Sequence, residues 1–393
     1  MREVYMDHNA TTPLHPRVRQ VMMDNLDVFG NPSSMHFYGR RAASLIEGAR
    51  NNIAALLNAS PDELIFTGGG SESNNTVLKL VTCGGASCTG CSAMRNEIIT
   101  TKIEHPSVLN TCQAMERQGM TVHYLDVDPQ GRIDMEQLKG FLSDRTALVS
   151  IMMANNEIGT IQDIKAAAAI AHEKSVLFHT DAVQAIGKIP VDVRDLGVDF
   201  LSFSGHKLNA PKGIGGLFVK RNAPYCTLIH GGHQEEGRRA GTLNTLGIIA
   251  LGEAAKIAME EGPQEAARLA ELRDYIKAGI EQSIPDIHIN GHPIENLPGT
   301  LNVSFKGAEG ESILLYLDME GIAISTGSAC ASGSLDPSHV LLATGVGPEL
   351  AHGSIRISLG LGSNKEDADY LLEKLPPVIA RIRMMSTVYN KAG

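Results

Sequence analysis

The sequence predicts an α/β fold, with a large domain around a mostly parallel seven-stranded sheet and a smaller α+β domain after it. Two observations lead to this prediction. Through the middle of the chain, short apolar runs alternate with helical patterns, which is typical of a parallel sheet whose crossovers are helices. Beyond Pro285 the pattern changes to a mixture of shorter elements.

Seven apolar runs are the expected strands of the large sheet, because short, continuous, β-branched runs are typical of strands covered on both faces. They are LIFT (64–67), EIITT (97–101), TVHYL (121–125), ALVSIMM (147–153), VLFHT (176–180), DFLSFS (199–204) and GLFV (216–219). Between them, the spacing of Leu109, Cys112 and Met115 predicts a helix over 106–117. A second helix is expected over 163–174.

Two long helical patterns, 243–261 and 263–283, follow the sheet, and Pro263 is expected to interrupt them. The smaller domain then contains LNVSF (301–305), a helix over 309–320, IAIS (322–325) and IRISL (355–359). Its last helix is expected to open with the capping-box spacing of Ser363 and Glu366. We therefore assign 15–260 to the large domain, and 1–14 together with 261–393 to the small domain.

The bulk composition is that of a globular protein, with 43% hydrophobic and 20% charged residues among 393. A formal net charge of -10 argues against a uniformly basic nucleic-acid binder, so we expect no nucleic-acid partner. The polar start of the chain lacks the apolar core of a signal peptide, and no apolar run reaches the length of a membrane helix. Six cysteines in so long a chain are not a disulfide framework. We therefore expect a cytoplasmic protein with reduced thiols and no membrane contact.

Polar groups follow several expected strands directly, at the edge of an α/β sheet where ligands bind. The run Gly68-Gly69-Gly70-Ser71 follows LIFT, where backbone N–H groups and a helix start favour an anion. Alone it is a weak signal, because tight glycine turns are common at this place. Asp181 follows VLFHT, and a buried carboxylate there needs a cationic or hydrogen-bonding partner. A helix N-cap is the alternative that the residue in isolation favours.

A lysine and a histidine follow two more of these strands. Lys207 stands after DFLSFS between Ser204, His206 and a glycine-rich turn, which a solvated charge explains poorly, although a surface lysine is the alternative. A lysine amine can form a Schiff base with an aldehyde cofactor, whose phosphate Ser204 and His206 could hold. His105 opens the helix after EIITT, and this position favours acid–base work or ring stacking over a purely structural role.

Two further residues suit a substrate. Cys330 lies in STGSACASGS (325–334), where small residues surround a single thiol, as expected for an exposed nucleophile rather than a packed cysteine. Arg356 lies in the expected strand IRISL among apolar neighbours. A buried arginine needs a bidentate carboxylate partner, and a substrate carboxylate would serve.

Taken together, these segments resemble the cysteine desulfurases of the NifS/IscS type, in the class V aminotransferase family. The resemblance runs nearly end to end, and the order and spacing of its motifs are jointly very specific. The motifs are MDHNATTP (6–13), FGNPSSMH (29–36), GGGSESNN (68–75), IEHPSV (103–108), NNEIGTIQD (155–163), HTDAVQAIGK (179–188), SFSGHKLNAPKGIGG (202–216), GGHQEEGRRAGTLN (231–244), STGSACASGSLDPSHVL (325–341) and GSIRISLG (353–360). The resemblance implies a homodimer of pyridoxal 5'-phosphate fold type I that takes sulfur from L-cysteine and releases L-alanine.

The resemblance also implies roles around the cofactor ring. Lys207 matches the lysine that forms the Schiff base, and Asp181 matches the acid that pairs with the pyridinium nitrogen. His105 matches a catalytic residue stacked on the ring. Gln184 matches the group beside the ring hydroxyl, and Asn156 matches a further cofactor contact.

The phosphate of the cofactor is expected at a second group of positions. The family's phosphate-binding residues match Gly70, Ser71, Ser204 and His206. Thr242 would reach the phosphate that the partner subunit binds.

The substrate and the sulfur acceptor follow from the same resemblance. Arg356 and Asn156 match contacts to the substrate carboxylate, with Asn31 as a weaker candidate. Lys207 would move a proton from the substrate Cα, and the Cys330 thiolate would take the substrate sulfur as a persulfide. An iron–sulfur scaffold protein of the IscU/NifU kind is the expected acceptor. Cys330 could then also serve as an iron–sulfur ligand during cluster transfer.

A few positions depart from the family pattern. Ser71 stands where threonine is usual and preserves the hydroxyl, while His8, His233 and Glu236 replace more usual residues near the expected subunit contact. These changes leave the chemistry intact.

The largest departure is the C-x4-C-x2-C run of Cys83, Cys88 and Cys91. Its spacing suits an iron–sulfur or zinc site. Three thiols lack an obvious fourth ligand, so free surface thiols are the favoured alternative.

Two other functions remain open at this point. One is a selenocysteine lyase or related aminotransferase, although an aminotransferase would not need Cys330. The other is a catalytically silent scaffold in a sulfur-transfer complex, although a scaffold would not need Lys207, Asp181 and His105.

Overall fold

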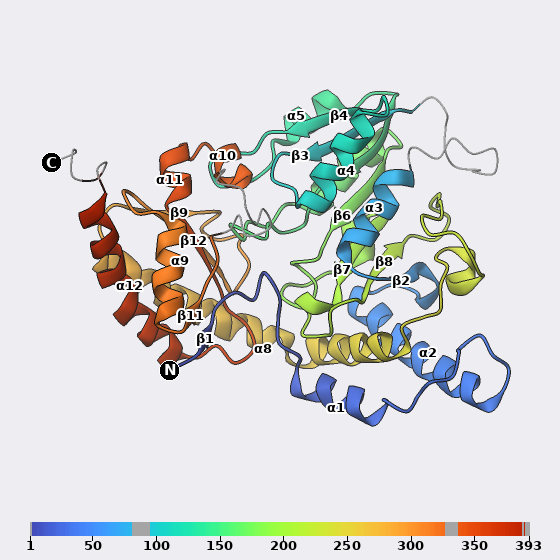
Figure 1. The fold of residues 1–393 in the computed structure, drawn as a ribbon. Coiled ribbons are helices and arrows are strands. Elements are labelled where there is room, and N and C mark those ends of the chain that lie inside the picture. Colours follow the sequence, from blue (N-terminus) through green and yellow to red (C-terminus); the bar gives the residue numbers. More distant parts are fainter. Residues whose placement is uncertain (1, 81–94, 327–336, 387–388, 390–393) are drawn as a thin grey trace.

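The computed structural model describes residues 2–80, 95–326, 337–386 and 389. Figure 1 shows two lobes side by side, with the large sheet in one and the chain's C-terminal elements in the other. None of the described helices combines the length and the apolar character that a bilayer span needs.

The larger lobe is built on a seven-stranded sheet with the order β2-β8-β7-β6-β5-β3-β4. Its strands are β2 (Leu64–Thr67), β3 (Glu97–Thr101), β4 (Thr121–Leu125), β5 (Thr146–Ser150), β6 (Leu177–Asp181), β7 (Phe200–Ser204) and β8 (Gly215–Val219). Strand β8 is antiparallel to both β2 and β7, and the other pairings are parallel. Six strands therefore point the same way, and their carboxyl ends meet at one edge. The prediction of a mostly parallel, seven-stranded sheet is confirmed.

Helices cover both faces of this sheet. One core packs against α1 (Pro16–Asp24), α2 (Phe37–Leu57), α5 (Met135–Phe141), α6 (Ile164–Glu173) and the first half of α8 (Thr245–Ser283). A second core packs against α3 (Gly70–Leu80) and α4 (Pro106–Glu116). Neighbouring strand residues alternate between the two cores, as Phe200 and Leu201 do in β7, because successive side chains leave opposite faces of a strand. The short helix α7 (Val193–Leu196) precedes β7.

The smaller lobe has its own core around a three-stranded antiparallel sheet of order β12-β10-β9. The strands are β9 (Ile287–Asn290), β10 (Thr300–Phe305) and β12 (Ser354–Ser358), and the covering helices are α9 (Gly310–Met319), α12 (Lys365–Met385) and the second half of α8. The N-terminal strand β1 (Val4–Tyr5) pairs in parallel with β11 (Ile322–Ala323). Two short helices, α10 (His339–Ala343) and α11 (Pro348–His352), lead into β12. The first residues of the chain thus belong to the core of the C-terminal lobe.

Helix α8 connects the two lobes as one continuous helix of 39 residues, so the expected interruption at Pro263 is wrong. Ile248, Leu251 and Ala255 belong to the core of the large sheet, whereas Ile276 and Ile280 belong to the core of the small one. Packing at both ends outweighs the loss of one helical hydrogen bond and the ring clash of a proline. The two separate cores at the two ends of this helix support the domain division at 260, which stays a prediction.

Two smaller expectations in the C-terminal lobe are also wrong. Helix α12 is capped by Asn364, whose side chain accepts from Asp367 N, because Ser363 instead accepts from Gly360 N in the preceding turn. Strand β11 ends at Ala323, and Ser325 forms a separate bridge to Arg356.

Candidate active site

The carboxyl edge of the large sheet brings together four of the residues that the sequence analysis selected. Asp181 is the last residue of β6, and Lys207 ends the 3-10 turn η2 (Gly205–Lys207) directly after β7. His105 caps the N-terminus of α4, and Gly70 begins α3. Each lies at or just after the carboxyl end of a strand, and these strands share one direction, so sheet topology places all four at one edge.

Asp181 is a buried carboxylate held by hydrogen bonds. The residue is only 5% exposed. Its carboxylate accepts hydrogen bonds from Asn74 Nδ2 at 2.7 Å and from Val183 N at 2.9 Å. Turns rather than a helix follow it, so the helix N-cap interpretation is wrong. None of the ion pairs formed by the described residues includes Asp181. A buried carboxylate with donors but no cation is suited to a cationic ligand.

A hydrogen-bonded chain links Asp181 to His105. Asn74 Nδ2 lies 2.9 Å from Ser107 Oγ, which lies 2.9 Å from His105 Nδ1. Burial lowers the pKa of His105; the Asp181 carboxylate raises it, and Lys207 and His339 lower it further. His105 is therefore neutral at neutral pH, as a residue that stacks on an aromatic ring should be.

The glycines before α3 form a close corner with β7 and the turn after β6. A Cβ on Gly70 would lie 2.5 Å from Val183 Cγ2 and 3.7 Å from Ser204 Cβ. Within the described part of the chain, the N–H groups of Gly70 and Ser71 have no acceptor. Open N–H groups at a helix start beside the Ser204 hydroxyl make an anion site. His206 stands after Ser204, and burial with the nearby lysines lowers its pKa to about 4.

A second network surrounds Lys207, and Asn9 is its centre. Lys207 Nζ donates to the carbonyl oxygens of Asn9 and Ala10. Gln184 Nε2 also donates to Asn9 O, at 3.0 Å, and Lys188 Nζ donates to Asn9 Oδ1 at 3.0 Å. Lys207, Gln184 and the N-terminal segment are thus brought together.

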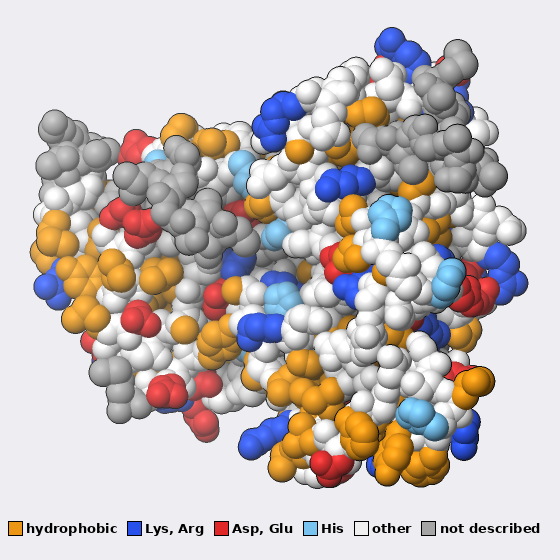
Figure 2. Space-filling view, turned by 45° about the vertical axis from the view of Figure 1, so that its right-hand side comes forward, with side chains coloured by type: hydrophobic (Ala, Val, Ile, Leu, Met, Phe, Trp, Pro, Cys, Tyr) orange, Lys and Arg blue, Asp and Glu red, His pale blue; other side chains and the backbone are white. Residues whose placement is uncertain are grey.

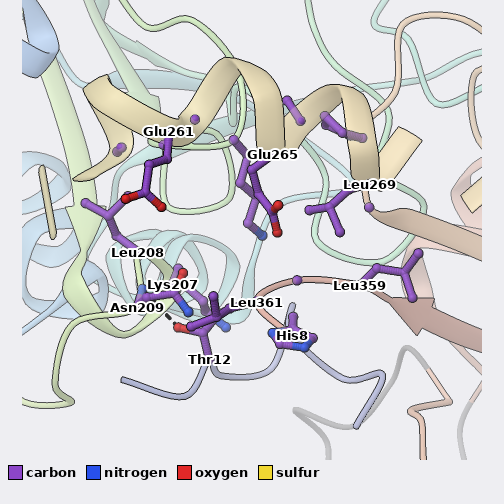
Figure 3. A pocket seen from close by; sticks show the side chains of 18 of the residues that line it. His8, Thr12, Lys207, Leu208, Asn209, Glu261, Glu265, Leu269, Leu359 and Leu361 are labelled. Atoms are coloured by element: carbon purple, nitrogen blue, oxygen red, sulfur yellow. Dashed lines mark hydrogen bonds between the residues drawn. The ribbon is translucent and has the colours of Figure 1, made fainter. Parts of the chain in front are cut away.

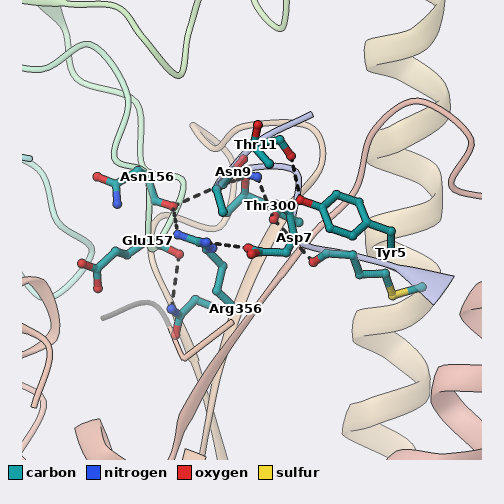
Figure 4. A network of polar contacts seen from close by, with 12 residues as sticks. Tyr5, Asp7, Asn9, Thr11, Asn156, Glu157, Thr300 and Arg356 are labelled. Carbon is teal, nitrogen blue, oxygen red and sulfur yellow. Dashed lines mark hydrogen bonds and ion pairs between the residues drawn. The ribbon is translucent and has the colours of Figure 1, made fainter. Parts of the chain in front are cut away.

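Arg356 lies at the junction of the two lobes (Figure 4). It is 3% exposed, pairs with Asp7 Oδ1 at 2.7 Å, and donates to Asn156 O at 3.0 Å. Its Nε is buried and makes no hydrogen bond with any described group. The predicted need for a carboxylate is thus met in part by Asp7, and Nε remains available to a ligand.

Sequence reasoning missed several residues of these networks. Asn74, Asp7 and Asn9 lie inside motifs that resemble the family's, but their partners are far away in sequence, as with the 349 residues between Asp7 and Arg356. Glu104 was also missed: burial raises its pKa to about 8, although hydrogen bonds from Met152 N and Thr101 Oγ1 oppose the shift. Its sequence context, between Ile103 and His105, gave no signal of burial.

Other selected residues stand apart from these networks. Asn31 lies in the exposed loop between α1 and α2 and accepts from Ser33 N, while Thr242 is exposed just ahead of α8. In the described residues, no hydrogen bond connects either one with Lys207 or Arg356.

Four cysteines cannot be placed in this site. Cys330 and the run of Cys83, Cys88 and Cys91 lie outside the described residues. Within the described residues, no group of three or more metal-ligating side chains is present. The expected metal and persulfide roles of these four thiols stay predictions.

A cavity of about 440 Å³ borders Lys207 (Figure 3). Figure 3 shows Glu261, Glu265 and Leu269 of α8 facing His8, Thr12 and Lys207 across it. Lys188 also lines it, whereas Asp181, His105 and Gly70 do not. The cavity therefore adjoins the site without being the site itself.

The residues at the sheet edge fit pyridoxal 5'-phosphate. Asp181 supplies a buried carboxylate without a cation, the Gly70 corner supplies an anion site, and Lys207 supplies an amine at the same edge of the sheet. These three chemical types are the counterparts of the cofactor's pyridinium nitrogen, phosphate and aldehyde.

Comparisons with known proteins agree with this geometry. The model of the family "Aminotransferase class-V" matches residues 4–371. A cysteine desulfurase IscS of Dictyoglomus turgidum is 49% identical over 98% of this chain and 96% of its own length. A cysteine desulfurase of Gluconacetobacter diazotrophicus is 47% identical over 100% of this chain and 97% of its own length. A solved NifS-like protein superposes with a TM-score of 0.90 at 38% identity, covering 97% of this chain and 100% of that one. Fold and sequence agree over nearly the whole length, and the chain belongs to the class V aminotransferase family.

Proposed function

We propose that this chain is a cysteine desulfurase, a sulfurtransferase that uses pyridoxal 5'-phosphate. It takes sulfur from L-cysteine, releases L-alanine and holds the sulfur as a persulfide on Cys330. The observation that carries the proposal is the meeting of Lys207, Asp181 and His105 at one sheet edge, with the buried Arg356 at the lobe junction. Relatives named cysteine desulfurase, at 47 to 49% identity, supply the substrate class.

Residues at the sheet edge would hold the cofactor. Lys207 would bind its aldehyde, Asp181 its ring nitrogen, and His105 one face of its ring. When bound, the cofactor withdraws electrons from the substrate Cα and so eases loss of a proton there. Because Asn74 and Val183 fix the Asp181 carboxylate, little reorganisation is needed to stabilise the positive ring.

The phosphate would lie in the corner between α3 and β7. Gly70 and Ser71 would donate backbone N–H groups, and Ser204 and His206 would face the phosphate from the end of β7. Thr242 is exposed, which supports a contact to the phosphate bound by a partner subunit.

The substrate would be oriented from the lobe junction. Arg356 Nε is a buried donor available to a carboxylate, and Asn156 lies beside the arginine. Asn31 would contribute through a partner subunit, because it lies in the exposed loop between α1 and α2 and no hydrogen bond of the described residues connects it with Arg356. A carboxylate at Arg356 would point the substrate's Cα toward Lys207, which bonds the neighbouring Asn9 and Ala10.

Two side chains of this protein would carry the chemistry. The neutral amine of Lys207 takes the proton from the substrate Cα. The Cys330 thiolate attacks the substrate sulfur, so that an S–S bond forms while the Cβ–S bond breaks, and the carbon skeleton leaves as alanine after protonation. Cys330 is left with one additional sulfur atom, which an acceptor thiol then removes.

We further propose a homodimer whose partners share their sites. Hydrophobic side chains gather at the lower right of Figure 2, where α1 and α2 lie in Figure 1. The exposed apolar residues of α2 and of the loop between α1 and α2 include Leu26, Phe29, Met35 and Phe37, with exposures of 67, 76, 91 and 63%. An apolar patch of this kind supports a subunit contact.

The sulfur acceptor and the compartment complete the proposal. We propose that an iron–sulfur scaffold protein of the IscU/NifU kind receives the sulfur, as the IscS name of several relatives suggests. Cys330 could ligate a cluster during transfer. A cytoplasmic location is supported by Cys112, which is a free thiol.

The test is the reaction of the purified protein with L-cysteine. Wild type with pyridoxal 5'-phosphate should form alanine and, with a thiol reductant, an equal amount of sulfide. Cys330→Ser should lose sulfide formation, because a serine hydroxyl cannot accept sulfane sulfur, yet should still bind the cofactor. Cys112→Ser is the matched control and should keep full turnover, since this thiol lies on α4 and is buried in the core, where substrate cannot reach it. Sulfide formation that survives in Cys330→Ser would contradict the assignment. The same assay with selenocysteine in place of cysteine tests the alternative function. Turnover of selenocysteine without turnover of cysteine would indicate a selenocysteine lyase.

A further inference from the structure

Lys188 is a cation without a carboxylate partner. Its Nζ donates to Gln184 Oε1 at 2.7 Å and to Asn9 Oδ1 at 3.0 Å. None of the ion pairs of the described residues includes it. The mechanism above does not use it, yet both of its partners belong to the network around Lys207.

The first effect of Lys188 is on the orientation of Gln184. A lysine ammonium can only donate, so the amide oxygen of Gln184 must face it. The amide nitrogen of Gln184 then faces Asn9 O, to which Lys207 also donates. Lys188 therefore decides which end of Gln184 is presented to the cofactor site.

The second effect is on charge. Lys188 and Lys207 both contact Asn9, Lys188 through its side-chain oxygen and Lys207 through its carbonyl. Two ammonium groups this close repel each other, so a proton on one disfavours a proton on the other. Lysines used as nucleophiles or bases are activated in this way by a neighbouring cation.

We propose that Lys188 is a positioning residue for the cofactor site, which orients Gln184 and Asn9 and whose charge disfavours a proton on the Lys207 amine. This inference rests on the proposed function of Lys207. A neutral amine is what Lys207 needs both to bind an aldehyde and to take a proton from a substrate carbon.

The surroundings of Lys188 support a coupled pair of amines. Burial, the charge of Lys207 and the charge of Arg356 together lower the pKa of Lys188 to about 7. The titratable and charged groups that face it are Lys207, Arg356, His8 and His206, with His15, Glu261, Glu265 and Arg268 around the adjoining cavity. Arg268 Nε and Nη2 donate to the two carboxylate oxygens of Glu265, and Asp7 pairs with Arg356. The carboxylates nearby are thus committed to arginines rather than to Lys188.

The experiment uses the full-length chain stripped of cofactor. Pyridoxal 5'-phosphate is added at a series of pH values, and the rate of adduct formation is followed by absorbance. Lys188→Met should move the pH midpoint of this rate upward by about one unit, because Lys207 loses the neighbouring charge. Lys188→Arg keeps the charge and should keep the midpoint within a few tenths of a unit. Lys212→Met, which removes an exposed lysine near His206, should leave the midpoint unchanged.

Borohydride reduction and peptide mapping separate this inference from the proposed function. An adduct on a lysine other than Lys207 in the wild type would overturn the proposed function. An adduct on Lys207 with an unmoved midpoint in Lys188→Met would overturn the role of Lys188 alone. Should Lys188→Met not fold, NMR of the wild-type chain with ¹³C-dimethylated lysines decides instead. The resonances of Lys188 and Lys207, assigned through Lys188→Arg and Lys207→Arg, should titrate as a coupled pair with one of them near neutral pH. Independent titration of both near the ordinary lysine value would overturn the inference.

Discussion

Asp181 shows how a single carboxylate is prepared for a positively charged ligand. Asn74 and Val183 hold its two oxygens, and nearly all of the residue is withdrawn from water. Neither donor carries a full charge, so the carboxylate keeps its capacity to pair with a cation. His105 is linked to the same carboxylate through Asn74 and Ser107 but is neutral because of its burial.

Asp181→Ala should therefore weaken cofactor binding strongly. The protonated ring nitrogen would lose its counter-charge in a buried site, which costs about 3 kcal/mol, or roughly a hundredfold in affinity. Equilibrium dialysis of pyridoxal 5'-phosphate against the variant measures this loss. Asp199→Ala is the comparison and should keep its affinity for the cofactor. Asp199 is a buried acid that accepts from His172 and from Phe178 N, and it directly precedes β7, away from the carboxyl edge of the sheet. Unchanged affinity in Asp181→Ala would mean that Asp181 only closes its local turn.

The residues of the site differ in how visible they are in the sequence. Lys207, Asp181 and His105 could be selected because each stands directly after an apolar strand, where a charge or imidazole has no structural need. Asp7 and Lys188 could not, because their importance comes from partners across the lobe junction. Spacing within a segment carries no information about such partners.

The helices and strands also differ in how far the sequence predicts them. Three strands, β2, β3 and β4, have the expected limits, because each is a short run rich in β-branched and aromatic residues. The continuity of α8 past Pro263 was not visible, since it depends on two separate cores holding the two ends of one helix. Likewise, the cap of α12 depends on Ser363 bonding Gly360.

At the start of α3, Gly70→Ala should lower the affinity for the cofactor without unfolding the protein. The added Cβ would meet Val183 Cγ2 at 2.5 Å, so the first turn of α3 must move away from the corner that we assign to the phosphate. A loss of roughly tenfold, about 1.4 kcal/mol, is expected for a displaced anion site. Binding of inorganic phosphate and of pyridoxal 5'-phosphate, measured by calorimetry, tests this.

Gly140→Ala is the matched control for this substitution. Gly140 lies in α5, and a Cβ there meets nothing within 4 Å. The variant should bind both ligands normally and gain about 0.5–1 kcal/mol of stability, because alanine favours the helix more than glycine does. If both glycine variants bound the cofactor equally well, the phosphate would have to lie elsewhere.

On the scale of the whole molecule, the site depends on both lobes being docked. Arg356 comes from the small sheet, Lys207 from the large one, and the N-terminal segment with Asp7 and Asn9 bonds to both. The N-terminal segment thus joins the beginning of the chain to residues that lie far along it. Basic, acidic and histidine side chains are visible at the junction of the lobes in Figure 2. Polar contacts at this junction make the molecule's stability sensitive to pH.

Buried histidines should make the folded state lose stability in acid. Burial lowers the pKa of His179 to about 3, and the pKa values of His8 and His206 are lowered to about 4. In the unfolded chain a histidine binds its proton near pH 6.5. Between that pH and the folded pKa, the unfolded state holds more protons than the folded state. The free energy of unfolding must therefore fall as the pH drops below 6.5, which urea titrations from pH 7 to pH 4.5 would measure.

His179→Gln isolates one of these protons. His179 lies between Ser150 Oγ and Ser202 Oγ, at 2.8 and 2.9 Å, so its replacement should cost about 1–3 kcal/mol at pH 7. The slope of stability against pH below 6 should become shallower by about one proton, or ~1.4 kcal/mol per pH unit. His352→Gln, at an exposed position on α11, should leave the slope as in wild type, because water solvates this side chain in both states. Equal slopes in wild type and His179→Gln would show that His179 takes up its proton without unfolding, so that the Ser150–His179–Ser202 bridge tolerates a charge in the centre of the sheet.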